Sequence, residues 1–241
     1  MVFVRAIVFN ILFYSNLILW MVVFSPALLG PRPPVAEIAR RWARSSLALL
    51  RLVVGVDAEF RHTERIPAGG ILVASKHQSF WETFALFTVL PSPVFILKRE
   101  LMWIPFFGWY LAKIGCIGVN RQSGELSARE MVEKSKRALA ENQQLVIFPE
   151  GTRKAPGAPP DYKRGVAMLY RLLKVPCQPV ALNSGLFWPR RKLIRRRGVI
   201  LVEFCPVIPA GIDRDAFLEQ VQRTIEDTTA SLLHEGRETL Y

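Results

Sequence analysis

The sequence has 241 residues, of which 51% are hydrophobic and 22% charged, and its net charge is +12. This length fits one large domain, or one domain with an appended segment, and the apolar content excludes a disordered chain. The cysteines are Cys116, Cys177 and Cys205. Because they are odd in number and far apart, neither a disulfide scaffold nor a structural zinc site organises the fold. Positive mean hydropathy together with a pI near 10.1 points to a basic protein at a membrane surface.

The N-terminal segment carries no charged residue between Arg5 and Arg32. About 20 consecutive apolar residues are enough to cross the core of a bilayer, so residues 6–30 predict a membrane-embedded helix. A cleaved signal peptide is the alternative interpretation. The apolar run is too long for that, and no small-residue cleavage site follows it.

Basic residues follow this apolar run, whereas only Arg5 precedes it: Arg32, Arg40, Arg41, Arg44 and Arg51. The positive-inside rule therefore predicts a protein of the cell inner membrane whose body lies on the cytoplasmic face. Residues 45–56 are apolar but too short to span a bilayer, which favours an interfacial helix or the return arm of a half-buried hairpin. One full span and a hairpin in one leaflet both remain open.

The rest of the chain alternates short β-rich runs with helical patterns. We predict a division into residues 1–56, the membrane anchor, and residues 57–241, the folded domain. Strands are predicted at 71–75, 94–98, 116–119, 145–148, 178–182 and 199–204, and helices at 80–90, 125–142, 163–173 and 212–233. This alternation predicts an α/β fold with a mostly parallel sheet flanked by helices. In such sheets the chemistry sits where the strands end, at their carboxyl edge.

A histidine and a carboxylate follow the first of these strands, as His77 and Glu82. In a regular helix two residues five positions apart do not share a face. The pair therefore predicts His77 in a turn and Glu82 in the first turn of a helix, with its side chain reaching back. A carboxylate that holds one imidazole nitrogen protonated leaves the other nitrogen free as a general base.

Three further strands also lead into polar residues. Glu150, Gly151, Thr152 and Arg153 follow the strand at 145–148; glycine allows close approach of the backbone to an anion, and arginine offers a planar fork to phosphate oxygens. Lys98 ends the strand at 94–98, and Arg121 follows the strand at 116–119. Their convergence on one edge of the sheet predicts a site for an anionic substrate beside a histidine base.

The order and spacing of these segments resemble the four sequence blocks of the glycerophospholipid acyltransferases, and within them the bacterial PlsC-type 1-acyl-sn-glycerol-3-phosphate acyltransferases. The blocks are His77-x4-Glu82, the stretch from Lys98 to Arg121, Phe148-Pro149-Glu150-Gly151-Thr152-Arg153, and Val175-Pro176-Cys177-Gln178-Pro179-Val180. The resemblance covers about residues 57–205. One position departs from it, because the family's usual acid in the first block is Asp and here it is Glu82.

The resemblance implies transfer of a fatty acyl chain from a thioester to the sn-2 hydroxyl of lysophosphatidic acid, which forms phosphatidic acid for phospholipid synthesis (EC 2.3.1.51). His77 and Glu82 are then the catalytic residues. Lys98, Arg121, Glu150, Gly151, Thr152 and Arg153 bind the substrate, with Lys98 as a candidate for stabilising the oxyanion. No metal or cofactor is implied; acyl-CoA or acyl carrier protein supplies the acyl group. The expected partners are these substrates and an anionic membrane surface, without nucleic acid.

Two kinds of alternative stay open at this level. Within the enzyme class, the acceptor is another lysophospholipid, glycerol 3-phosphate or an aminoacyl lipid, because the Glu150–Arg153 segment favours a phosphate without fixing its carrier. From a different class comes a non-catalytic lipid-binding membrane protein that keeps the fold. The presence of both His77 and Arg153 argues against that protein.

Overall fold

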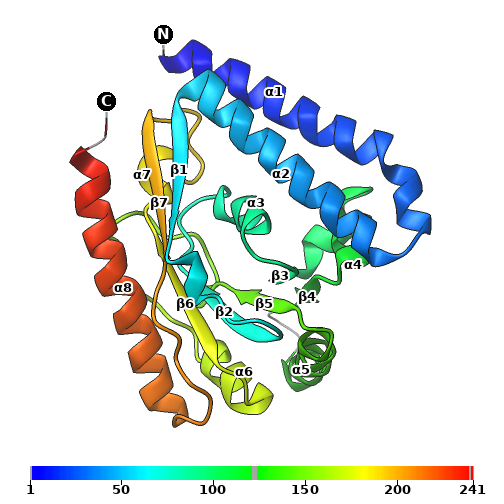
Figure 1. Cartoon of the computed structure of the whole chain (residues 1–241), viewed down its shortest axis with the longest axis vertical. Coiled ribbons are helices and arrows are strands. Elements are labelled where there is room, and N and C mark those ends of the chain that lie inside the picture. The colour runs from blue at the N-terminus through cyan, green and yellow to red at the C-terminus, as the bar shows by residue number, and fades with distance from the viewer. Residues whose placement is uncertain (1, 121–123, 239, 241) are drawn as a thin grey trace.

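The computed structural model describes residues 2–120, 124–238 and 240, and it places a central sheet between two sets of helices (Figure 1). A hairpin of two long helices, α1 (Val2–Val23) and α2 (Arg32–Val54), lies along one side of the molecule. The last helix, α8 (Arg214–Glu238), lies along the opposite side. The sheet between them carries the segments singled out in the sequence.

Within the described residues, the sheet has seven strands in the order β1-β7-β6-β2-β5-β3-β4. They are β1 (Val56–Arg61), β2 (Ile71–Ser75), β3 (Pro93–Lys98), β4 (Ile117–Val119), β5 (Gln144–Ile147), β6 (Cys177–Leu182) and β7 (Gly198–Phe204). All neighbouring pairs are parallel except β6 with β7. The predicted fold class, a mostly parallel sheet flanked by helices behind an apolar N-terminal helix, is confirmed.

Alternate residues of the central strands enter two separate hydrophobic cores. Val73 of β2 and Val146 of β5 belong to the core shared with the helical hairpin, together with Phe9 and Phe13 of α1. Leu72 and Leu145 face the other way and pack with Phe217 of α8. Both faces of β2 and β5 are therefore covered, which explains their continuous apolar sequences.

Shorter helices complete the two layers. They are α3 (Glu82–Ala85), α4 (Phe107–Ile114), α5 (Gly124–Ala140), α6 (Gly165–Leu173) and α7 (Ser184–Phe187). The single helix predicted at 80–90 is wrong in detail: α3 has one turn and passes into a 3-10 helix, Leu86–Thr88. The chain then turns at Leu90–Pro91 toward β3, and proline restricts the preceding residue away from helical backbone angles.

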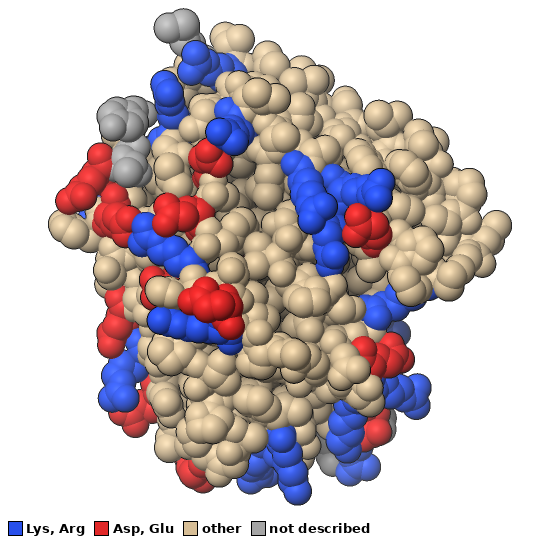
Figure 2. Space-filling view, viewed as in Figure 1, with Lys and Arg blue, Asp and Glu red and all other residues tan. Residues whose placement is uncertain are grey.

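The helical hairpin packs closely on the folded domain. Phe13 of α1 lies edge-on to Trp188, with ring centroids 5.6 Å apart, and Arg40 of α2 donates hydrogen bonds to the carbonyls of Phe87 and Leu90. The helix α1 is also long and apolar enough to cross a membrane, with a mean hydropathy of 2.0. Figure 2 shows almost no charged side chains on the surface over α1, in contrast to the rest of the face.

Candidate active site

The site lies at the carboxyl edge of β2 and β5, where two loops meet. β2 and β5 are parallel neighbours, so the segment after Ser75 and the segment after Ile147 leave the sheet side by side. The backbone N–H of Lys154 donates to the carbonyl of His77 at 2.8 Å. The ring of Phe148 stacks on the His77 imidazole with centroids 4.0 Å apart. The two loops therefore hold the imidazole in place from two directions.

His77 and Glu82 have the geometry expected from their spacing. His77 lies in the turn after β2, Glu82 is the first residue of α3, and Nδ1 is 2.8 Å from the Glu82 Oε1 atom. The same Oε1 atom accepts the backbone N–H groups of Gln78 at 2.8 Å and Ser79 at 2.7 Å. A carboxylate oxygen only accepts hydrogen bonds. Nδ1 of His77 is therefore the third donor to Oε1 and carries the proton. Nε2 then keeps its lone pair and is available as a base.

Glu82 is completely buried and its second oxygen is also hydrogen-bonded. Oε2 accepts the hydroxyl of Ser184, the first residue of α7, at 2.8 Å. A buried carboxylate needs such donors because burial costs free energy unless the charge is hydrogen-bonded. Ser184 was not among the residues predicted from the sequence, because it lies 102 positions beyond Glu82 and carries no motif of its own.

The turn after Phe148 depends on its glycine. Gly151 has φ of +65°, a backbone conformation that glycine adopts without strain, and its N–H donates to the Phe148 carbonyl at 2.8 Å. Thr152 is half-buried in the same turn. Glu150 differs from the expectation, because its side chain is buried and its Oε1 atom accepts the Lys76 ammonium at 2.9 Å. The Glu150 carboxylate thus faces the interior, and direct binding of substrate by this group remains an unsupported prediction.

Arg153 lines a basic cavity of about 450 Å³ beside the dyad. The other residues around this cavity come from α1, the start of the α3 segment and the loop between α7 and β7: Asn10, Tyr14, Phe80, Trp188, Pro189, Arg191, Lys192, Leu193 and Arg195. Burial lowers the pKa of Arg153, and the nearby cations Arg190 and Arg191 lower it further. Guanidinium groups gathered at a half-buried cavity favour an anion there, and Arg153 offers the paired donors that suit phosphate.

Lys98 is not among the residues that line this cavity. Lys98 ends β3 with its side chain 61% exposed and its ammonium 4.0 Å from Glu100. Arg121 lies outside the residues that the structure describes, so its predicted role stays a prediction. Cys116, Cys177 and Cys205 are buried, and burial raises the pKa of Cys116 to about 11. Among the described residues, no group of three or more His, Cys, Asp or Glu side chains could hold a metal ion.

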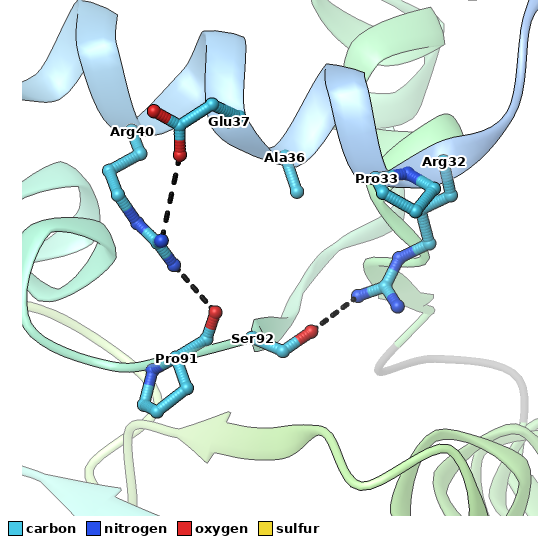
Figure 3. Close-up of a pocket in the computed structure, with 7 residues that line it drawn as sticks. All are labelled: Arg32, Pro33, Ala36, Glu37, Arg40, Pro91 and Ser92. Atoms are coloured by element: carbon cyan, nitrogen blue, oxygen red, sulfur yellow. Dashed lines mark hydrogen bonds and ion pairs between the residues drawn. The ribbon is translucent and has the colours of Figure 1, made fainter.

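A second, smaller cavity of about 180 Å³ lies between α2 and the segment before β3 (Figure 3). Arg40 donates to the carbonyl of Pro91, and Arg32 donates to the Ser92 hydroxyl at 3.3 Å, so both arginines point from the helix toward the domain. Arg40 is also ion-paired with Glu37 at 3.6 Å. These cations bind the hairpin to the domain.

Comparison with known proteins assigns the chain to a family. The model of the family described as "Acyltransferase" matches residues 57–183. The 1-acyl-sn-glycerol-3-phosphate acyltransferase of Pseudomonas aeruginosa is 32% identical over 95% of this chain and 91% of that protein. The human 1-acyl-sn-glycerol-3-phosphate acyltransferase alpha is 26% identical over 95% of this chain and 83% of that protein. The chain therefore belongs to the acyltransferase family.

A solved structure shares the fold. The crystal structure of the 1-acyl-sn-glycerophosphate (LPA) acyltransferase PlsC from Thermotoga maritima has a TM-score of 0.81, with 19% identity, over 96% of this chain and 98% of that chain. The match covers nearly the whole of both chains, including the two long helices here. At this level of identity the likeness establishes the common architecture.

Proposed function

We propose that this protein transfers a fatty acyl group from an acyl thioester to the sn-2 hydroxyl of lysophosphatidic acid and releases phosphatidic acid, a step of phospholipid synthesis. The observation that carries the proposal is the buried Glu82 carboxylate on Nδ1 of His77, next to a cavity lined by Arg153. The names of the Pseudomonas and human relatives supply the acceptor.

In the proposed mechanism, Nε2 of His77 takes the proton from the acceptor hydroxyl as its oxygen attacks the thioester carbonyl. Glu82 keeps the Nδ1 proton in place and stabilises the imidazolium that forms. The tetrahedral intermediate collapses, the carbon–sulfur bond breaks, and the imidazolium returns its proton to the leaving thiolate. The thioester is already an activated acyl donor, so this sequence needs no covalent acyl-enzyme, metal or cofactor.

Arg153 holds the acceptor's phosphate in this proposal, with Lys98 and Arg121 as further cations and the Gly151–Thr152 turn as a source of hydrogen-bond donors. The thiol carrier is coenzyme A or acyl carrier protein, and the two are distinguished by assay. The Arg190–Arg197 segment adds positive charge beside the cavity; this charge attracts anionic headgroups at a membrane surface.

The experiment measures acyl transfer from long-chain acyl-CoA and from acyl carrier protein to lysophosphatidic acid by the purified full-length protein. We expect product from the wild type and a loss of at least about 10²-fold in kcat for His77→Ala, since general base catalysis contributes about 10²–10⁴-fold. His234→Ala is the matched control, because His234 is exposed on α8, where its Nε2 atom lies 3.9 Å from the Glu238 carboxylate.

Two results would overturn the proposal. Undiminished product from His77→Ala would show that His77 is not the general base. No product from the wild type with either donor would show that lysophosphatidic acid is not the acceptor. A panel of other lysophospholipids and glycerol 3-phosphate then identifies the acceptor used.

We also propose that the hairpin lies in one leaflet of the inner membrane, with the domain on the cytoplasmic face and residues 1–56 forming the membrane part. Two contacts of α1 with the body support this placement: Asn10 accepts a hydrogen bond from Arg195 at 3.0 Å, and the Met21 carbonyl accepts one from Tyr110 at 3.1 Å. These positions are about 16 Å apart along the helix, roughly half the thickness of a bilayer core. A helix held to the same body at both positions lies along the surface rather than through the membrane.

A further inference from the structure

Lys76, the residue before the proposed base, is a buried cation. Its side chain is 2% exposed, and its Nζ atom lies 2.9 Å from Oε1 of Glu150 and 2.7 Å from Oε1 of Glu226. An ammonium group removed from water is tolerated only when anionic or hydrogen-bonding partners replace its hydration. The carboxylates of Glu150 and Glu226 therefore both stabilise Lys76 in its buried position.

The two partners come from different parts of the chain. Glu150 belongs to the turn after β5, three residues before Arg153. Glu226 belongs to α8, in the part of the chain beyond residues 57–183 that the family model matches. Tyr162 donates its hydroxyl to the same Glu226 oxygen at 2.9 Å. One ammonium thus connects the loop of the base, the loop of the proposed phosphate ligand and the C-terminal helix.

The two carboxylates of this cluster differ in their burial and in their hydrogen bonds. Glu150 is buried with its Oε2 atom lacking a hydrogen-bond partner, and burial raises the pKa of its carboxyl group against the opposing effect of Lys76. Glu226 keeps 24% of its side chain exposed and has two donors on one oxygen. Glu226 is therefore the more solvated of the two carboxylates opposite the buried ammonium, and the one with a second donor.

We propose that Glu226 is a positioning residue for acyl transfer: through Lys76 it fixes the loop that bears His77 against the loop that bears Arg153. The catalytic effect of this positioning rests on the proposed function. The distance between His77 and Arg153 then determines how the acceptor hydroxyl is placed against the imidazole. A misplacement of about 1 Å between reacting groups costs about 10²-fold in rate.

The first test compares Glu226→Gln with Asp227→Asn, the neighbouring and exposed carboxylate of the same helix. We expect Glu226→Gln to lower kcat about tenfold with the KM for the acyl donor unchanged, and Asp227→Asn to leave both constants unchanged. Glu226→Asp, which keeps the charge, restores part of kcat. Wild-type kcat in Glu226→Gln, or an equal loss in Asp227→Asn, overturns the inference.

A second measurement does not depend on the acceptor. Hydrogen–deuterium exchange of the full-length protein is expected to quicken at residues 76–79 and 149–154 in Glu226→Gln, and to a smaller degree in Tyr162→Phe, but not in Asp227→Asn. Unchanged exchange in both loops rejects the positioning role, whichever acceptor is used. An inactive wild type combined with faster exchange in Glu226→Gln rejects the proposed function while it leaves the positioning role supported.

Discussion

At the scale of single residues, the surroundings of Glu82 explain how a glutamate serves at a position where the resembling family uses aspartate. Its two oxygens accept four donors: Nδ1 of His77, two backbone N–H groups and the Ser184 hydroxyl. The extra methylene is accommodated because Glu82 begins α3 and its side chain turns back over the preceding turn. The orientation of the imidazole thus depends on a carboxylate whose two oxygens are both held by hydrogen-bond donors.

We predict a clear order of activity for two substitutions of this residue. Glu82→Gln replaces one acceptor oxygen by an NH2 group, which cannot accept the donors on that side, and we expect kcat to fall about 10²-fold or more. Glu82→Asp keeps both acceptors at a shorter reach and is expected to lose less than Glu82→Gln. Steady-state rates at saturating substrate test this order, and equal rates for the two variants would contradict it.

At the scale of elements, the close approach of α8 to α7 is controlled by Gly236. A Cβ atom at this position would lie 2.4 Å from Nδ2 of Asn183, whose side chain donates to the Leu232 carbonyl at 2.8 Å and accepts the Leu201 N–H. Asn183 therefore ties α8 to β7, and it has little freedom to move aside.

The usual effect of replacing glycine in a helix is thus expected to reverse. Gly→Ala in an exposed helix stabilises by about 1 kcal/mol, whereas Gly236→Ala is expected to destabilise by about 1–3 kcal/mol, as overpacking does. Thermal unfolding measures the difference, with the exposed Ser231→Ala of the same helix as the control. A raised Tm in Gly236→Ala would show that α8 moves away from Asn183 without cost.

An ion pair joins α8 to the edge strand β1, and it predicts a dependence on pH. Arg61 contacts both oxygens of Glu235, at 2.6 and 2.8 Å, and this hydrogen bonding holds the pKa of Glu235 below its ordinary value of 4.5. A carboxyl with a lowered folded-state pKa stabilises the protein above pH 4.5, and this contribution disappears as the pH falls through the folded-state pKa.

We therefore expect Glu235→Gln to lower the stability at pH 7 by about 0.5–1 kcal/mol, the range for an exposed pair of good geometry. Below pH 4.5 the difference from the wild type should decrease toward zero. Unfolding in denaturant at a series of pH values gives both numbers, and Glu238→Gln is the control on the same helix. A difference that does not change with pH would assign the effect to packing.

The sequence predicted most elements but not their pairing. Strands β2 to β7 and the pair His77–Glu82 follow from local patterns. The edge strand β1 was missed, because Val56–Arg61 contains three charged residues and pairs with β7, more than 130 residues later, as Val56 with Gly198. The inward direction of Glu150 was also missed. Its partner Lys76 follows the neighbouring strand β2 but lies 74 positions earlier in the chain, and spacing along the sequence carries no information on which side chains meet across a sheet.

At the scale of the whole molecule, the placement of α1 decides how the protein meets the membrane. In a helix that lies in one leaflet both ends face the same compartment, whereas in a spanning helix they face opposite ones. The three native cysteines are buried, so reagents directed at thiols have a low background in this protein. This allows a test with single introduced cysteines.

We expect Val2→Cys and Leu29→Cys to react with a membrane-impermeant thiol reagent from the cytoplasmic side only. The two positions are 54% and 93% exposed and lie at opposite ends of the first helical arm. Labelling in spheroplasts and in inverted membrane vesicles gives the comparison, with the unmodified protein as the background control. Reaction of one cysteine from each side would establish a full span instead.

Arg195 also has a consequence for the order in which the protein folds. This guanidinium lies 4.7 Å above the ring of Trp188 and bonds to Asn10, a residue 185 positions earlier in the chain. The first helix leaves the ribosome long before the segment that it docks against has been synthesised. Contacts across so large a sequence separation form late and slowly. The first helix therefore lacks this partner during most of synthesis, and the closing of the basic cavity around Arg195 is expected to be the last step of folding.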